Sequence, residues 1–265
     1  MFRKVFLLTL GLSILCSVFS VDISNIEFQE IGQKIFENEC NKKFGYLTHW
    51  NQGESFGSFG IGHFIWYPDG GKRIYNEKFP GFLIFLKSNK IRLPDFLQPD
   101  KPCPWKTRED FYKNYNSEKM IYLRELLDST KSLQAKFIVN NFEASIPKIK
   151  AAASLAKRQQ VEKILNAMLR TEAGLYPLID YVNFKGDGTR LSERYKGQGW
   201  GLLQVLENMK DPNSDSNIVK NFAESAKFVL KQRVENSPNK TEEQKRLPGW
   251  LKRIETYKEA KNNKP

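Results

Sequence analysis

The most informative segment of this chain reads Gly53-Glu54-Ser55-Phe56-Gly57-Ser58-Phe59-Gly60-Ile61-Gly62-His63. Its closely spaced glycines, at positions 57, 60 and 62, let a backbone turn tightly or let another group approach it closely. Because glycine weakens a strand, three of them among Phe and Ile indicate a surface shaped for a partner. We predict a glycine-rich β-hairpin beside a cleft, and an ordinary hairpin with glycines at its bends is the alternative.

The rest of the chain is predicted to be mainly helical. Ser24 can cap a first helix over 25–41, which ends on Glu37-Asn38-Glu39-Cys40. Pro68-Asp69-Gly70-Gly71 is a strong turn signal, and Lys185-Gly186-Asp187-Gly188-Thr189 is a second turn-rich loop. Hydrophobic spacing and capping signals predict further helices near 79–86, 107–111, 120–127, 131–145, 148–156, 158–171, 173–182, 200–209, 216–235 and 241–257. The expected fold class is mainly α (α+β), with many helices and one small β-hairpin near the N-terminus.

The N-terminus carries the pattern of a secretory signal peptide. Two basic residues precede a largely apolar run at 5–19, which is shorter than the roughly 20 apolar residues of a membrane-spanning helix. We predict cleavage after Ser20, so that residues 21–265 are periplasmic or secreted. Cys16 raises the alternative of a lipoprotein site, although Leu15 is bulky where that site needs a small residue.

The mature chain is strongly basic. Removing residues 1–20 deletes two basic residues and no acid, which lowers the formal net charge from +12 to +10. A basic exported protein is drawn to anionic polymers or membrane surfaces, and bacterial cell wall, nucleic acid and outer-leaflet glycolipid all qualify. The lysines are scattered, and no alternation of arginine with aromatic residues indicates single-stranded nucleic acid. We expect a monomer with no nucleic-acid partner and only transient membrane contact.

Two cysteines remain in the mature chain, Cys40 and Cys103, and both lie beside turn signals. An oxidising compartment permits a disulfide between them, which would tie the end of the first helix to the Pro102-Cys103-Pro104-Trp105 loop. We predict this disulfide, and two buried thiols are the alternative.

A helix that ends on a glutamate, followed by a hairpin that closes on Gly60-Ile61-Gly62-His63, resembles the catalytic core of phage-type lysozymes in the lysozyme-like superfamily. In that family the glutamate protonates the glycosidic oxygen, and a hydroxyl residue two positions before the first glycine lines the cleft. Glu39 and Ser58 match those two positions. At the position of the family's second acid this chain has Gln52, and Glu54 is the nearest carboxylate.

Two further likenesses lie elsewhere in the chain. Gly199-Trp200-Gly201-Leu202-Leu203-Gln204-Val205 is similar to the Gly-Leu-Met-Gln-Ile segment of goose-type lysozymes and lytic transglycosylases, but lies far downstream of Glu39. Most of the mature chain resembles a group of exported bacterial proteins that carry similar Asn-Glu-Cys and Gly-Ile-Gly-His-Phe-Ile-Trp-Tyr-Pro stretches and have no established activity. These resemblances imply a single lysozyme-like domain over 21–265 with a helical extension.

The lysozyme resemblance implies acid-catalysed cleavage of a glycan. Such cleavage needs a proton donor at the leaving oxygen and a way to stabilise an oxocarbenium-like centre. Glu39 would be the general acid, with a pKa raised by desolvation, while Glu54 would orient water or stabilise positive charge. Ser58 would hydrogen-bond the water or a sugar. Were Glu54 turned away, Glu39 alone could serve a lytic transglycosylase, and for each of the three side chains a purely structural or solvated role is the alternative.

Other side chains are candidates for binding the sugar. Trp50 can offer an aromatic face, and His63 closes the hairpin, although we expect it mainly to hydrogen-bond within the core. The polar region between helices is interpreted either as the opposite wall of the cleft or as a structural loop; its expected contributors are Asp180, Asn183, Glu193, Tyr195 and Gln204. We expect no metal, because the two histidines lack tight ligand spacing, and we expect no cofactor.

The sequence therefore predicts an exported lysozyme-like protein that cleaves peptidoglycan glycan strands, as a glycoside hydrolase (muramidase) or a lytic transglycosylase. The alternatives are a non-catalytic cell-wall or glycan-binding protein, and a secreted effector or inhibitor that binds another protein. Chitin and chitosan are alternative polymers.

Overall fold

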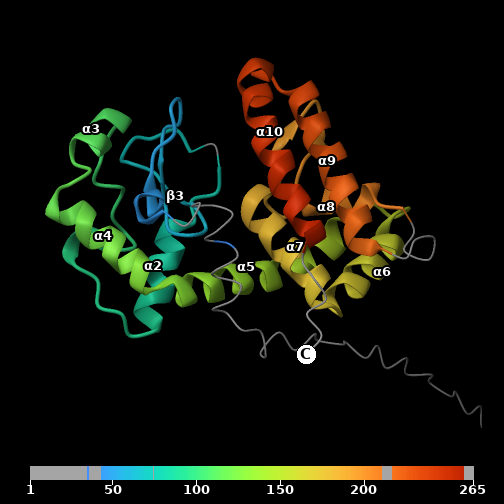
Figure 1. The fold of residues 1–265 in the computed structure, drawn as a ribbon, viewed down its shortest axis with the longest axis horizontal. Coiled ribbons are helices and arrows are strands. Elements are labelled where there is room, and N and C mark those ends of the chain that lie inside the picture. Colours follow the sequence, from blue (N-terminus) through green and yellow to red (C-terminus); the bar gives the residue numbers. More distant parts are fainter. Residues whose placement is uncertain (1–34, 36–42, 74, 211–216, 260–265) are drawn as a thin grey trace, which may run out of the picture.

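The structure, a computed structural model, describes residues 35, 43–73, 75–210 and 217–259, and Figure 1 shows two lobes joined by one long helix. The predicted signal peptide at 1–20 and most of the helix predicted over 25–41, including Glu39 and Cys40, lie outside the described residues. Ile35 is helical and buried. Within the described residues, no helix is both long enough and apolar enough to cross a membrane.

The N-terminal lobe combines a small sheet with short helices. After the 3-10 helix η2 (Phe44–Leu47), the strands β1 (Thr48–His49), β2 (Gly57–Phe59) and β3 (Phe64–Trp66) form an antiparallel sheet in the order β1-β2-β3. The elements that follow are α2 (Phe79–Ser88), the 3-10 turn η3 (Asp95–Leu97), α3 (Arg108–Lys113) and α4 (Glu118–Ser129). Helix α2 packs on β3, and η2 packs on α4.

Helix α5 (Lys131–Ala152) runs from the N-terminal lobe into the C-terminal lobe, where it packs on three helices (Figure 1). The C-terminal lobe contains α6 (Arg158–Leu169), α7 (Glu172–Lys185), α8 (Leu202–Asn208), α9 (Ile218–Asn236), α10 (Lys240–Thr256) and the 3-10 turn η5 (Tyr257–Glu259). A short hairpin, β4 (Arg194–Tyr195) and β5 (Gln198–Gly199), lies between α7 and α8. The buried hydrophobic side chains form one cluster that continues through both lobes.

The register of the sheet gives it an apolar face and a more polar face. Phe59 pairs with Phe64, and Ser58 pairs with both His49 and Ile65. Paired residues share a face, so Phe59 and Phe64 lie on one side and His49, Ser58 and Ile65 on the other. Phe59 and Phe64 pack on Phe79 and Phe82 of α2, each with ring centroids 5.0 Å apart. The His49 face therefore points away from the core of its lobe.

The predicted class, mainly helical with a small antiparallel sheet, is confirmed: 61% of the described residues are helical, and nine α-helices are present among them. The predicted cap of α3 is also present, since Thr107 Oγ1 accepts a hydrogen bond from the backbone N–H of Asp110 at 3.1 Å. Gly71 N donates to Pro68 O at 3.1 Å, which forms the predicted turn.

Two local predictions are wrong. The chain was expected to break near Pro147, but α5 continues through it, because burial of α5 along both lobes outweighs the loss of one helical hydrogen bond. The β4–β5 hairpin was expected to be loop. Its two-residue strands are too short to give an alternating hydrophobic pattern.

Candidate functional site

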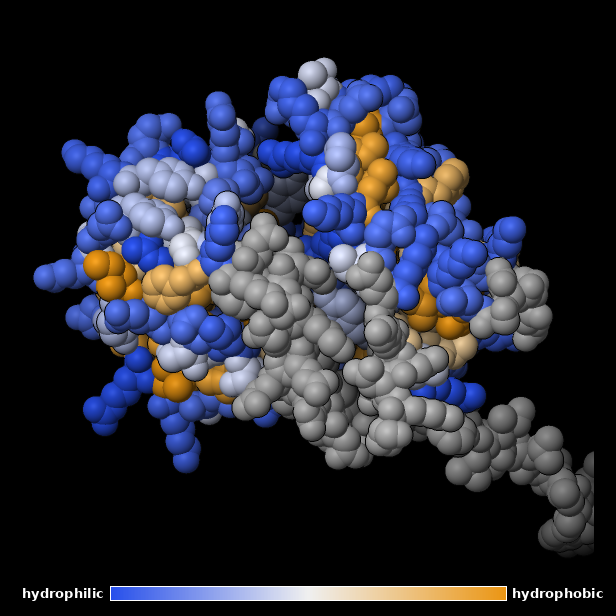
Figure 2. Space-filling view, viewed as in Figure 1, coloured by the Kyte–Doolittle hydropathy of each residue, from blue (hydrophilic) through white to orange (hydrophobic). Residues whose placement is uncertain are grey.

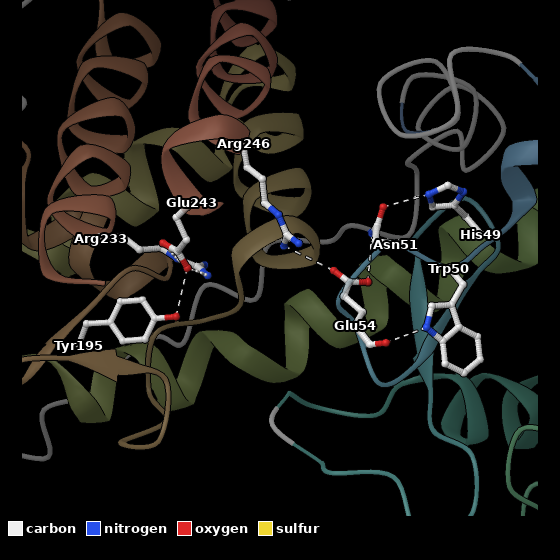
Figure 3. Close-up of polar contacts among 8 residues, drawn as sticks. All are labelled: His49, Trp50, Asn51, Glu54, Tyr195, Arg233, Glu243 and Arg246. Atoms are coloured by element: carbon white, nitrogen blue, oxygen red, sulfur yellow. Dashed lines mark hydrogen bonds and ion pairs between the residues drawn. The ribbon is translucent and has the colours of Figure 1, made fainter. Parts of the chain in front are cut away.

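A chain of polar side chains crosses from the N-terminal lobe to α10 of the C-terminal lobe (Figure 3). Tyr112 Oη lies 3.2 Å from His49 Nδ1, and His49 Nε2 lies 2.9 Å from Asn51 Oδ1. Asn51 Nδ2 donates to Glu54 Oε2 at 3.0 Å, and Glu54 Oε1 lies 3.5 Å from Arg246 Nη1. Glu54, in the turn between β1 and β2, is thus the point at which this chain passes from one lobe to the other.

The environment of Glu54 favours the protonated form of its carboxyl. Its side chain is only 13% exposed, and this burial raises its pKa above the ordinary value. The hydrogen bond from Asn51 and the charges of Arg246 and His63 act in the opposite direction, but the net shift is upward. A carboxyl of this kind holds a proton more strongly than one in water, which is the property that acid–base catalysis uses.

The hydrogen bonds of Asn51 determine which nitrogen of His49 carries the proton. Because Asn51 donates to Glu54 through Nδ2, its Oδ1 is the acceptor for His49, so His49 carries its proton on Nε2. Burial lowers the pKa of His49, which keeps the ring neutral near pH 7. The turn itself is closed by Trp50, whose Nε1 donates to the backbone oxygen of Glu54 at 2.8 Å.

An open pocket of about 600 Å³ lies beside this turn. Its wall belongs entirely to the N-terminal lobe and combines the Glu54 turn with the turn after β3 and the start of α3; the lining residues are Trp50, Gln52–Ser55, Pro68–Lys72 and Lys106–Glu109. The volume falls in the range of natural ligand pockets, which is about 300–1,000 Å³. Figure 2 shows a recess between the lobes that is bordered mostly by hydrophilic side chains.

The C-terminal side of the recess is formed in part by α10. Glu243, Arg246 and Trp250 are spaced by three and four residues, so they share one face of the helix. Glu243 is buried, Trp250 is half-buried and Arg246 is 45% exposed. Arg246 is therefore the member of this face that reaches the other lobe (Figure 3).

Several predicted residues do line the boundary between the lobes. Asn183 of α7 donates through Nδ2 to the backbone oxygen of Gly62, 3.4 Å away, which joins α7 to the turn that carries His63. His63 is half-buried and has a positive φ of 47°. Glu193 is 14% exposed, pairs with Arg190 at 3.7 Å, and has a pKa raised by burial.

Other predicted residues belong to the interior. Asp180 does not line the cleft: it is fully buried and bound to Arg253 through two hydrogen bonds of 2.9 and 2.6 Å. Tyr257 donates a third, of 2.5 Å, and burial, with the Asp180 carboxylate next in effect, raises the pKa of the Tyr257 hydroxyl, so that it remains a donor. Asp180 lies in the middle of α7, and nothing in the sequence indicated that its partner would lie on α10.

Tyr195 and Gln204 hold loops in place. Tyr195 is half-buried and donates to Glu243 Oε1 at 3.1 Å, and Glu243 is itself paired with Arg233 at 2.7 Å (Figure 3). Gln204 accepts from the backbone N–H of Gly201 at 3.0 Å and donates to the oxygen of Gly188 at 3.1 Å. Both side chains therefore act on protein partners.

Ser58 and Trp50 do not present the surfaces expected of them. Ser58 lies on the central strand β2 and is only 5% exposed. Trp50 touches the pocket wall, but its side chain is only 1% exposed and packs edge-to-face on Phe111. Cys103 is buried, and its predicted partner Cys40 lies outside the described residues, so the disulfide stays a prediction.

Sequence reasoning missed Asn51, Tyr112 and Arg246 as members of the site. The spacing His49-x-Asn51-x-x-Glu54 within one turn was the available signal for Asn51. Nothing in the sequence indicated Arg246, which is brought to Glu54 only by the packing of the lobes. In the part of the chain that is described, no three His, Cys, Asp or Glu side chains gather as a metal-ligand set.

Comparisons with protein-family models, with curated proteins and with solved structures find no match for this chain.

Proposed function

We propose that this protein cleaves the glycan strands of peptidoglycan by acid–base catalysis in the recess between its lobes, within a lysozyme-like fold. The observation that carries the proposal is Glu54: a partly desolvated carboxyl, held by Asn51 and Arg246, at the end of a polar pocket of about 600 Å³. Acidic residues with raised pKa values in a cleft are typical of catalytic sites. The resemblance of residues 30–66 to phage-type lysozymes supports the same chemistry.

In this proposal the two carboxyls divide the reaction. Glu39, five positions before η2 in the sequence, protonates the glycosidic oxygen as the bond to the leaving sugar breaks. Glu54, made more basic by burial, takes a proton from the water that attacks the sugar carbon. If Glu54 only stabilises positive charge and the muramic 6-hydroxyl attacks instead of water, Glu39, deprotonated when the leaving sugar departs, takes the proton of that hydroxyl and the same site acts as a lytic transglycosylase.

The test is turnover of purified, peptide-bearing cell wall, followed by mass spectrometry of the soluble fragments. A new reducing end identifies a hydrolase, and a 1,6-anhydro end identifies a transglycosylase. We expect Glu39→Gln to abolish release of fragments by either route and Glu54→Gln to abolish hydrolysis. Glu125→Gln, an exposed carboxyl on α4, is the matched control and should leave the rate unchanged.

A non-catalytic glycan-binding protein is the second candidate, and two observations favour it. Gln52 stands where phage-type lysozymes have their second acid, and Ser58 is buried rather than open to a cleft. Wild-type protein that co-sediments with cell wall and releases no fragment would establish this candidate and overturn the enzymatic proposal.

A further inference from the structure

The arginines of the C-terminal lobe differ in how fully they are used. Arg233 and Arg253 have side chains that are 8% exposed, and each meets one carboxylate through its Nε and Nη2 donors at 2.6–3.1 Å. Such two-point pairs fix the position of the guanidinium. Because both side chains are buried and held in this way, they are not open to a ligand.

Arg246 and Arg190 are used much less. Arg246 is 45% exposed, and among the described residues its one ion pair is the 3.5 Å contact with Glu54. Arg190 is 48% exposed and makes a 3.2 Å hydrogen bond to Asn76 and a 3.7 Å contact with Glu193. A guanidinium has five N–H donors, so both side chains keep donors for another acceptor.

Both arginines also connect the two lobes. Arg246 on α10 reaches Glu54, and Arg190 in the loop after α7 reaches Asn76, so each spans from the C-terminal lobe to a loop of the N-terminal lobe. Contacts of 3.5 and 3.2 Å leave no space for a sugar ring between the partners. A strand that enters at these points must separate them, and the freed guanidinium groups then need new acceptors.

We propose that Arg246 and Arg190 bind carboxylates of the entering strand, so that the recess selects an acidic glycan over a neutral one. This inference rests on the proposed function and names its substrate class. Carboxylates match the planar donor pair of arginine, and the formal net charge of +10 of the predicted mature chain favours a polyanion. Peptide-free peptidoglycan carries a lactyl carboxylate on every second sugar, whereas chitin, with the same backbone linkage, carries none.

Carboxylate binding would also change Glu54. The charge of Arg246 lowers the pKa of Glu54, in opposition to burial. A substrate carboxylate that neutralises Arg246 removes this effect, so Glu54 becomes a stronger base when the acidic strand is bound. Arg246 is in this respect a positioning residue, since it acts on the reaction through Glu54.

The test compares two tetrasaccharides that differ in the lactyl carboxylates: the peptide-free tetrasaccharide of alternating N-acetylglucosamine and N-acetylmuramic acid, and chitotetraose. Binding is measured by calorimetry in the Glu39→Gln protein, which lacks the proposed proton donor. We expect the acidic sugar to bind more tightly. Arg246→Ala and Arg190→Ala should each weaken its binding about tenfold, as for one charge-assisted hydrogen bond, and leave chitotetraose binding unchanged.

Two further variants separate recognition from general charge. Arg246→Lys keeps the charge but loses the planar donor pair, so it should bind the acidic sugar with intermediate affinity. Arg92→Ala removes an exposed arginine of the N-terminal lobe and should change neither affinity.

The outcomes distinguish the two proposals. The carboxylate inference is overturned if the Glu39→Gln protein binds the two sugars with equal affinity, or if adding Arg246→Ala weakens the binding of both sugars equally. Either result leaves the proposal of glycan cleavage intact. Failure to bind either sugar, together with no turnover of cell wall, overturns the proposed function and the inference with it.

Discussion

Each lobe fixes its own loops at the boundary between the lobes, and the interactions that do so differ between the two lobes. In the C-terminal lobe, two buried arginine–carboxylate pairs connect α9, α10 and α7, and Glu243 also receives the hydroxyl of Tyr195 from the hairpin. In the N-terminal lobe, the loop before His63 is held by an uncharged side chain. Gln134 of α5 accepts from the backbone N–H of Ile61 at 2.8 Å and donates to the oxygen of Leu127 at 2.6 Å.

Between the lobes, the interactions are weaker and more exposed. Arg246 and Glu54 meet through one contact of 3.5 Å, with the arginine 45% exposed. A buried charge must keep its partner or pay a large desolvation cost, whereas an exposed one exchanges its partner for water or a ligand cheaply. The difference teaches which charges maintain the fold and which are available for function.

The largest expected effect is that of Asp180→Asn. It leaves the buried guanidinium of Arg253 without its counter-charge, and such a change costs about 3–5 kcal/mol of folding free energy. The measurement is urea denaturation at pH 7, with the exposed Asp100→Asn as control. A loss of less than about 1 kcal/mol would mean that the buried pair does not maintain the C-terminal lobe.

Gln134→Ala tests the anchor of the N-terminal lobe. It removes the acceptor of the Ile61 N–H in a site where Gln134 is fully buried, and an unsatisfied buried group costs about 1–3 kcal/mol. We expect a loss in this range by denaturation, and none for the exposed Gln159→Ala. Stability equal to that of the wild type would show that the loop is held by its backbone alone.

Glu54→Gln tests the desolvated carboxyl through pH. Because burial raises the pKa of Glu54, the folded protein binds this proton more tightly than the unfolded chain does. The stability from this group is fully present below the unfolded-state pKa, about 4.3, and is lost as the pH rises through the folded-state pKa. Glu54→Gln removes this titration, so the melting temperature of the variant should fall less than that of the wild type between about pH 4 and pH 7.

That pH profile also has a clear contrary result. A variant whose melting temperature follows the wild-type profile at every pH would show that Glu54 is not desolvated. The Glu125→Gln protein, with an exposed carboxyl, provides the reference profile.

The smallest expected effect is that of Arg246→Ala on stability. Exposed ion pairs contribute about 0–1 kcal/mol, so its unfolding free energy should stay close to that of the wild type. In the same variant, NMR titration of the Glu54 carboxyl should give a higher pKa, since the Arg246 charge lowers it. A large loss of stability would show that Arg246, like Arg233 and Arg253, maintains the fold, and would contradict the view that its charge is available for function.

Local patterns determined most of the elements. The spacing of Phe79, Phe82, Leu83 and Leu86 marked α2, and all four side chains are buried in it. Thr107 marked the start of α3, and Pro68 to Gly71 marked the turn after β3. These features were predictable because capping, turn formation and helical amphipathicity depend on residues only a few positions apart.

The tertiary structure alone decided the roles of the charged and polar side chains. Asp180 and Glu54 are both carboxylates that the sequence offered as candidates for the cleft, yet one is buried against Arg253 and the other meets Arg246 between the lobes. Burial and partner are set by segments far away in the sequence, and it is these two quantities that determine pKa and availability. The chain's sequence by itself therefore identified Glu54 as a candidate, and the position of α10 in the fold decided that Arg246 meets it.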